Sequence, residues 1–308
     1  FQQGEYPMLK LGMYLLRDAA LSDEERLRIM RSTGFDFVCL GTSPYADGDL
    51  AATVALCERL DIPVENVHLT GSKTSLIWNE GDEGEAIADR YCREIEYVSS
   101  LGVKTGIAHV TWGKSAVAPI NETALCRYER IAECAEKNGF VLALENSVYP
   151  EYLYAVMDRV RGSRGIGYCF DSGHRNAFAP TEDFLGRFGD ILAATHLQDN
   201  NGKNDLHVYP FDGCSDWNEI AASLAKCPFA RKKICAEVSS DSFRKMPGLS
   251  ADEVRASVDR MAVAHDPHLF RAYDGGFAIY ESLTYAQRIE RLYVAMARIS
   301  DMIEAEAK

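Results

Sequence analysis

The chain has 308 residues, of which 47% are hydrophobic and 26% charged, a composition that excludes disordered, collagen-like and disulfide-scaffold proteins. A formal charge of −13 disfavours nonspecific attraction to nucleic acid or to an anionic membrane, so we expect a small-molecule partner. No stretch approaches the ~18 uninterrupted apolar residues of a membrane span, and the first ten residues lack a secretory pattern. The nine cysteines are scattered without a CxxC pair, which indicates a reducing compartment and predicts a cytoplasmic protein.

Short apolar runs rich in β-branched residues alternate with longer stretches of helical periodicity, the pattern of βα units around a parallel sheet. Eight strands are predicted, at Leu9–Tyr14, Phe35–Leu40, Pro63–His68, Thr105–His109, Val141–Glu145, Gly167–Asp171, Leu192–Leu197 and Ile234–Val238. The predicted helices are Ser22–Thr33, Asp49–Leu60, Gly84–Leu101, Glu122–Asn138, Glu151–Arg161, Thr181–Phe188, Asp216–Lys226 and one inside Ser282–Ala307.

Residues suited to helix ends support these elements. Acidic residues follow four candidate N-caps, where the helix dipole favours them: Ser22, Asn121, Thr181 and Ser250. Glycines suited to a left-handed helix end follow three helical runs, at Gly34, Gly102 and Gly139. Eight βα repeats without a linker favour a closed barrel over a doubly wound sheet. We therefore predict an α/β fold, a (β/α)8 TIM barrel formed by residues 1–308 as a single domain, in which Asp241–Tyr280 adds a helix and loop before the C-terminal helix.

Polar residues gather where the predicted strands end, which is the face on which barrels build their active sites. The residues at or just after these ends include five of the seven histidines and several carboxylates: His68, His109, Glu145, Asp171, His174, His196, Asp199, Asp205, His207 and Glu237. Glu145 and Glu237 interrupt apolar runs, where burying an unpaired carboxylate is costly. A bound cation would remove that cost, whereas the alternative is an internal hydrogen-bond network without metal.

Carboxylate and imidazole ligands suit Mn²⁺, Zn²⁺, Co²⁺ or Mg²⁺, and the absence of cysteine from this set argues against a structural zinc site. Trp112 follows the fourth strand and is a candidate apolar wall for a sugar ring, with loop packing as the alternative. Arg175 is a candidate partner for a phosphate or carboxylate, with a salt bridge as the alternative. The run Arg231, Lys232 and Lys233 precedes the eighth strand at the opposite end of the barrel and is expected to be a solvated charge cluster.

An ordered series of motifs resembles the xylose isomerase-like barrel superfamily, which includes sugar and sugar-phosphate isomerases, ketose 3-epimerases and endonuclease IV. The series is LALEN, FDSGH, THLQDN, the DxH of NDLH, FDGCSDW and CAEVS, and it extends over nearly the whole chain. The resemblance implies a divalent-metal-dependent isomerase or epimerase of a sugar, sugar phosphate or polyol. Proton transfer would pass through a metal-bound enediolate.

The epimerase-like members imply one divalent ion, Mn²⁺ first and Zn²⁺, Co²⁺ or Mg²⁺ as alternatives, held by Glu145, Asp171, His196 and Glu237. Glu145 and Glu237 would also act as the catalytic acid and base. The substrate-binding candidates are His68, His109, Glu151, His174, Lys203 and His207. Lys203 is included because Gly202 stands where such epimerases carry an arginine. The sequence leaves open whether the protein forms a homo-oligomer.

A second hypothesis is a zinc-dependent endonuclease of abasic DNA that resembles endonuclease IV. Counterparts of its nine zinc ligands exist at His68, His109, Glu145, Asp171, His174, His196, Asp205, His207 and Glu237. The charge of −13 stands against it, as does Leu206, where the nuclease pattern favours arginine. One ion per chain would indicate the sugar enzyme and three zincs the nuclease. A third reading, an inactive sugar-binding barrel, is disfavoured because binding alone needs no paired acid and base.

Overall fold

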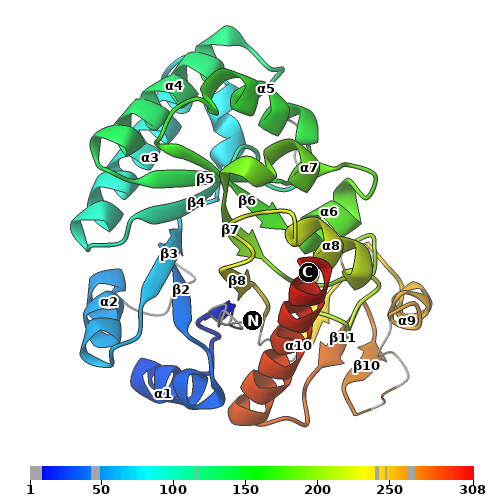
Figure 1. The fold of residues 1–308 in the computed structure, drawn as a ribbon. Helices are drawn as coiled ribbons and strands as arrows, with labels where there is room; N and C mark the ends of the chain where they lie inside the picture. Colours follow the sequence, from blue (N-terminus) through cyan, green and yellow to red (C-terminus); the bar gives the residue numbers. More distant parts are fainter. Residues whose placement is uncertain are drawn as a thin grey trace.

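The computed structural model describes residues 9–42, 49–114, 117–239, 243–246, 248–261, 266 and 268–308. Its centre is an eight-stranded parallel sheet with the order β7-β6-β5-β4-β3-β2-β1-β8, seen in Figure 1. The strands are β1 (Lys10–Tyr14), β2 (Phe37–Gly41), β3 (Val64–His68), β4 (Thr105–His109), β5 (Val141–Glu145), β6 (Ile166–Asp171), β7 (Leu192–His196) and β8 (Lys233–Ala236).

The sheet closes on itself between β7 and β8 through a narrow seam. Leu197 and Ala236 form a parallel bridge, and the Leu197 N–H donates to the Cys235 carbonyl over 2.9 Å. The Cys235 N–H donates instead to the side-chain hydroxyl of Thr195 over 2.8 Å. Because every strand thereby has two neighbours, the predicted (β/α)8 barrel is confirmed.

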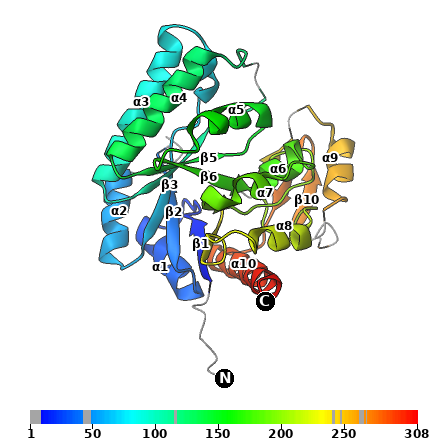
Figure 2. The ribbon, with the colours of Figure 1, turned by 45° about the horizontal axis from the view of Figure 1, so that its top comes forward.

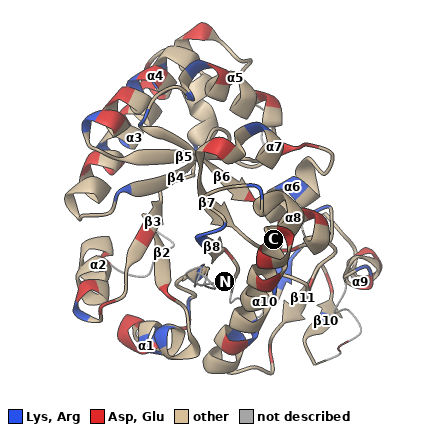
Figure 3. Ribbon diagram, viewed as in Figure 1, with Lys and Arg blue, Asp and Glu red and all other residues tan. Residues whose placement is uncertain are grey.

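Helices surround the strands and carry most of the acidic and basic residues, while the strands are mainly uncharged (Figures 2 and 3). They are α1 (Asp23–Thr33), α2 (Leu50–Arg59), η1 (Thr74–Trp78), α3 (Asp82–Ser100), α4 (Glu122–Lys137), α5 (Pro150–Val160), α6 (Ser172–Phe178), α7 (Phe184–Phe188), η2 (Gly189–Ile191), α8 (Trp217–Leu224), α9 (Ala251–Val258) and α10 (Tyr285–Glu306). No described helix combines the length and apolarity needed to cross a membrane.

The helix-end predictions are confirmed at most positions. Ser22 forms a capping box with Glu25 at the start of α1, and Gly34 ends that helix with φ of 122°. At Gly34 a β-carbon would lie 2.8 Å from the Tyr293 ring, so glycine is required by space as well as by backbone angle. The prediction for Thr181 is wrong, because Asp183 caps α7 and that helix begins only at Phe184.

Alternation along the strands decides which residues enter the barrel. Ile107, Ala143, Cys169 and Ala194 form a buried cluster inside the barrel. Each of them precedes a polar strand-end residue by two positions, so that polar residue belongs to the same face of its strand. The small residues fill the interior, and His109, Glu145, Asp171 and His196 form the next layer toward the carboxyl ends.

The segment before the last helix differs from its prediction. Besides the helix α9, it contains a three-stranded antiparallel sheet in the order β10-β11-β9, made of β9 (Phe243–Lys245), β10 (Phe270–Tyr273) and β11 (Gly276–Ile279). β10 and β11 form a hairpin that turns at Gly275, whose φ is 67°. The strands escape a sequence search because each is only three or four residues long. Helix α6 was also not predicted.

Candidate active site at the carboxyl ends of the strands

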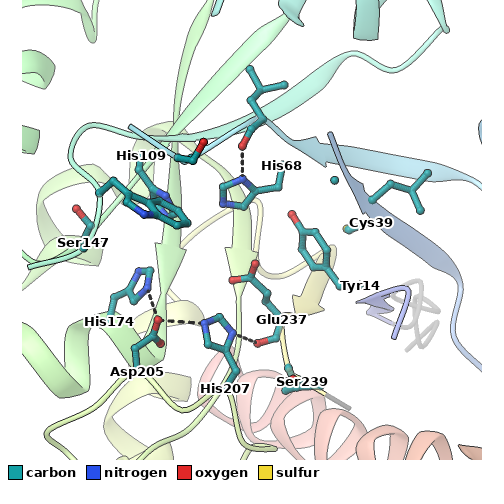
Figure 4. Close-up of a pocket in the computed structure, with 18 of the residues that line it drawn as sticks. Tyr14, Cys39, His68, His109, Ser147, His174, Asp205, His207, Glu237 and Ser239 are labelled. Carbon is teal, nitrogen blue, oxygen red and sulfur yellow. Dashed lines mark hydrogen bonds and ion pairs between the residues drawn. The ribbon is translucent and has the colours of Figure 1, made fainter. Parts of the chain in front are cut away.

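A cavity of about 1000 Å³ opens at the carboxyl ends of the barrel strands. The small sheet forms part of its wall through Lys245, and the loop after β4 contributes Trp112 and Lys114. Figure 4 shows imidazoles and carboxylates converging on the cavity from different strands and loops. The polar residues that line it include His68, His109, His174, Asp205, His207 and Glu237.

The four predicted metal ligands lie together at the carboxyl ends of the strands, and of the four Glu237 is the one that lines the described cavity. Each offers one ligand atom, and these atoms all lie within 4.8 Å of one another, in the set Glu145, Asp171, His196 and Glu237. Three of them are the last residues of β5, β6 and β7, and Glu237 follows β8 directly. The parallel register aligns these ends, since Asp171 pairs with His196 across β6 and β7.

Glu145 lies at the centre of a ring of imidazoles and is fully buried. Its Oε2 lies 3.1 Å from Nε2 of His109 and 3.4 Å from Nε2 of His68. Its Oε1 lies 3.1 Å from Nδ1 of His174 and 3.2 Å from Nδ1 of His196. Despite this proximity, neither Glu145 oxygen has a partner with hydrogen-bond geometry among the described residues. A buried carboxylate without such partners is costly unless a cation satisfies it.

The charge states of the three carboxylates follow from burial and the facing imidazoles. Burial on its own raises the pKa of Glu145, but His196 and His109 outweigh it and hold that pKa well below its ordinary value. Burial is likewise opposed at Glu237, where His196 is the main partner and the pKa falls to about 2. At Asp171 burial dominates and raises the pKa to about 7. A cation among them would favour the ionised form of all three.

The donor set fits a hard or borderline divalent cation. Three carboxylates and one imidazole are ligands that Mn²⁺, Zn²⁺ or Co²⁺ accept. Nδ1 of His196 is buried, lies 3.0 Å from Oε2 of Glu237, and has no hydrogen-bond partner among the described residues. The sequence reasoning missed Cys169, whose sulfur lies within the same reach of His196 and Glu145. Burial raises the pKa of Cys169 to about 12, so it is a protonated thiol and a weak ligand.

Further contacts orient the ligand side chains. Nε2 of His196 lies 3.1 Å from the hydroxyl of Tyr14, and that hydroxyl donates to Oδ1 of Asn66 over 3.2 Å. Asp171 accepts from the backbone N–H of His174 over 2.6 Å and from Nε2 of Gln198 over 3.3 Å. The sequence reasoning did not single out Asn66, which follows Glu65 in β3 and is 1% exposed.

A second group of ligand-type side chains lies beside the first. Asp205 Oδ2 lies 3.3 Å from Nε2 of His174 and 3.1 Å from Nε2 of His207. His68, His109 and Glu145 form a third group with ligand atoms within 4.8 Å. All nine residues of the predicted series therefore occur in three adjoining groups.

Other predicted residues do not belong to the group of four predicted metal ligands. Glu151 is exposed in the first turn of α5 and Lys203 is exposed in the loop after β7, and neither belongs to the described residues that line the cavity. Arg175 takes its alternative role, since it forms two hydrogen bonds to Glu219 of 2.6 and 3.1 Å. Asp199 accepts from the backbone and hydroxyl of Ser215 and so holds the glycine-containing turn.

Two minor predictions also have structural outcomes. Trp112 is 42% exposed, lines the cavity and lies over His109 with ring centroids 5.3 Å apart. The expectation of a fully solvated basic cluster is wrong for Lys233, because it pairs with Glu65 at the start of β3. The Lys233 ammonium group is therefore paired with a carboxylate of another strand.

A family model and a known protein match parts of this chain in sequence. The model of the family described as xylose isomerase-like TIM barrel matches residues 27–262. The chain belongs to this family. A relative of this xylose isomerase-like barrel, the uncharacterized protein y4fM of Sinorhizobium fredii, is 39% identical over 99 residues. That match spans 30% of this chain and 32% of the relative, so the chain covers about a third of its length.

Solved structures share the fold of this xylose isomerase-like barrel over almost its whole length. An L-ribulose 3-epimerase has a TM-score of 0.67, 15% identity and 97% coverage of both chains. A D-psicose 3-epimerase from Clostridium cellulolyticum H10, solved with D-tagatose, has a TM-score of 0.65 at 16% identity, covering 97% and 100%. The IOLI protein with a bound zinc atom has a TM-score of 0.64 at 17% identity, covering 95% and 98%. These likenesses concern the fold.

Proposed function

We propose that this protein is a divalent-metal-dependent isomerase or epimerase of sugars, sugar phosphates or related polyols. The observation that carries the proposal is the convergence of Glu145, Asp171 and His196 with Glu237, with both Glu145 oxygens buried and unsatisfied among the described residues. Similarity of fold to two sugar 3-epimerases and to a zinc-containing protein supports it. Mn²⁺ is the proposed ion, with Zn²⁺, Co²⁺ or Mg²⁺ as alternatives.

When bound, such an ion supplies Lewis acidity to a carbonyl and its neighbouring hydroxyl. The chain's own residues then move the proton of the adjacent carbon. Glu237 lines the cavity with an 18% exposed side chain and is ionised at neutral pH, so it can accept that proton. Glu145 comes from β5, on another side of the barrel, and is held ionised, so it would first take up a proton from solvent and then deliver it from a different direction. Return of the proton to the neighbouring carbon gives isomerisation, and return to the opposite face of the same carbon gives epimerisation.

Solvent exchange tests this chemistry directly. We expect the carbon-bound hydrogen next to the carbonyl of the true substrate to exchange with D₂O, as measured by NMR, in protein loaded with Mn²⁺, Co²⁺ or Mg²⁺. A panel of ketoses, inososes and hydroxypyruvate supplies the candidate substrates. The Glu237→Gln variant is the matched control and should show no exchange. Turnover of a panel member without any incorporation of deuterium would contradict the proposed proton transfer.

The cavity mouth favours a substrate with a negative charge. Lys114 follows β4 and Lys245 lies on β9, and both line the cavity. Among the described residues neither lysine has a carboxylate partner, although Lys114 lies over the Phe178 ring at 5.1 Å. Three described carboxylates share the cavity and each has a partner: Asp23 pairs with Arg26, Asp205 with two histidines, and Glu237 with His196. Uncompensated positive charge at the mouth attracts phosphate or carboxylate groups.

Removing these two charges should change selectivity. We expect the double variant Lys114→Met and Lys245→Met to raise KM for a phosphorylated ketose about tenfold, while KM for the same ketose without phosphate stays within about twofold. Steady-state kinetics on the matched pair of substrates measures the effect. An equal rise for both substrates would indicate disturbed packing of the mouth instead of a lost charge contact.

A second candidate function rests on the three adjoining ligand groups, which match the series expected of a zinc-dependent endonuclease of abasic DNA. The net charge of −13 opposes it, since nuclease affinity depends on phosphate contacts. Metal analysis of protein dialysed against Zn²⁺ separates the two candidates. One tightly bound ion per chain and no cleavage of an abasic duplex supports the sugar enzyme, whereas three zincs with cleavage supports the nuclease.

A further inference from the structure

A chain of polar contacts crosses the barrel interior from its amino end to the candidate metal site. It starts at Lys233, the first residue of β8, which pairs with Glu65 near the start of β3. Nδ2 of Asn66 donates to Oε2 of Glu65 over 3.1 Å, and Asn66 is 1% exposed. Oδ1 of Asn66 accepts from the Tyr14 hydroxyl, which lies 3.1 Å from Nε2 of His196.

An irregularity in β3 makes this chain possible. Val38 pairs with Val64 and Cys39 with Asn66, so Glu65 is an extra residue opposite a single step of β2. Such a bulge interrupts the strict alternation of a strand and redirects side chains. The consecutive residues Glu65 and Asn66 can therefore contact each other, which regular alternation would prevent.

The direction of every hydrogen bond follows from the carboxylate at one end. Glu65 accepts from Lys233 and from Nδ2 of Asn66, so Asn66 presents its amide NH₂ to Glu65 and its carbonyl oxygen to Tyr14. The Tyr14 hydroxyl then donates to Asn66, and its oxygen is free to accept from His196. When an ion is bound, His196 is neutral, and its hydrogen is thereby favoured on Nε2, which leaves the lone pair on Nδ1.

Nδ1 is the nitrogen that faces the proposed ion. It lies 3.2 Å from Oε1 of Glu145 and 3.0 Å from Oε2 of Glu237, and the Cys169 sulfur lies near the same group. A hydrogen on Nδ1 would occupy the space that a cation needs. We propose that Glu65, Asn66 and Tyr14 are positioning residues that hold the His196 hydrogen on Nε2 and so prepare Nδ1 to bind the metal. This inference rests on the proposed function, because it takes His196 as a ligand.

Glu65→Gln reverses the chain while leaving its shape intact. Lys233 still donates to the oxygen of Gln at this position, so the new NH₂ group faces Asn66. Asn66 then turns its oxygen toward position 65 and its NH₂ toward Tyr14, and the Tyr14 hydroxyl donates to Nε2 of His196. The hydrogen of His196 moves to Nδ1. We expect the dissociation constant for Zn²⁺, measured by competition with a chromophoric chelator, to rise 10- to 100-fold.

A matched control and a double variant separate this effect from general loosening of the fold. Glu136→Gln removes the same charge from an ion pair with Arg164 on the outer surface and should leave Zn²⁺ affinity unchanged. Tyr14→Phe interrupts the chain and should itself weaken binding. In the Tyr14→Phe background, Glu65→Gln should not weaken Zn²⁺ binding further, because the missing hydroxyl breaks the series of hydrogen bonds between position 65 and His196. Additive losses would overturn the proposed relay.

Nitrogen NMR provides a signature that a purely structural role would not give. In zinc-loaded protein labelled at the histidine ring nitrogens, we expect His196 to carry its hydrogen on Nε2, with its signal assigned from the His196→Gln variant. Glu65→Gln should add a population with the hydrogen on Nδ1 at the zinc concentration that saturates the unaltered protein. If Glu65→Gln does not fold, Asn66→Leu serves, because it also frees the Tyr14 hydroxyl to donate to His196.

The outcomes distinguish this inference from the proposed function. Failure of the unaltered protein to bind any divalent ion would remove both. Normal zinc binding combined with unchanged affinity and an unchanged His196 hydrogen in Glu65→Gln and Asn66→Leu would overturn the relay alone.

Discussion

Glu237→Gln is expected to lower kcat by about 10²–10⁴-fold, the usual contribution of a positioned acid or base. Glu237 is the proposed ligand carboxylate whose side chain reaches the cavity, and its pKa of about 2 keeps it available as a base at neutral pH. Glutamine has nearly the same shape but cannot accept the proton. The measurement is steady-state kinetics on the substrate identified by the panel, with metal content determined on the same samples.

Metal content decides how this loss is interpreted. A Glu237→Gln variant that retains its ion yet loses turnover supports the role of Glu237 in proton transfer. Loss of the ion together with turnover would indicate that Glu237 acts only as a metal ligand. The Glu136→Gln protein, altered on the outer surface, should keep full activity. Full activity of Glu237→Gln at normal metal content would end the acid and base assignment.

Adding a divalent ion should raise the midpoint of thermal unfolding by roughly 4 °C at a hundredfold excess over its dissociation constant. An ion that binds only the folded state contributes about 2.7 kcal/mol under that condition. With an unfolding entropy of about 2.1 cal/mol/K per residue, each kcal/mol shifts the midpoint of this 308-residue chain by about 1.5 °C. Chelation should reverse the shift. Differential scanning calorimetry on chelated and reloaded protein measures it.

Glu145→Gln provides the critical variant for this experiment. Its two oxygens are the buried atoms whose satisfaction the ion is proposed to supply, so the variant should lose most of the thermal shift. Glu136→Gln should shift like the unaltered protein. An unchanged thermal response in Glu145→Gln would place the ion elsewhere in the molecule.

The strand-end residues could be placed from sequence because two regularities act together. Parallel strands of a barrel direct their carboxyl ends to one face, and alternation assigns every second residue to the interior. Glu145 and Asp171 each end a clear apolar run, so their positions followed from both rules. Glu151 had only its spacing from Glu145 as support, and the structure places it exposed in the first turn of α5.

Contacts that depend on register or on pairing between distant loops had no such rule. Cys169 is different, because it lies two positions before Asp171 on the same strand and alternation therefore places it on the same face, near the site. The contact between Glu65 and Asn66 depends on the bulge in β3, which local sequence does not mark, and Lys233 pairs with Glu65 from a strand distant in sequence. The small sheet was missed because its strands are too short for a periodic signal.

The seam between β7 and β8 gives the proposed ion a mechanical consequence. His196 ends β7 and Glu237 follows β8, so an ion shared by these side chains would bracket the parallel bridge at Leu197 and Ala236. The ion would connect β7 to β8 at the position in the barrel where the backbones of neighbouring strands are paired least. Binding of the ion would then hold β7 and β8 together and complete the proposed catalytic site at the same time.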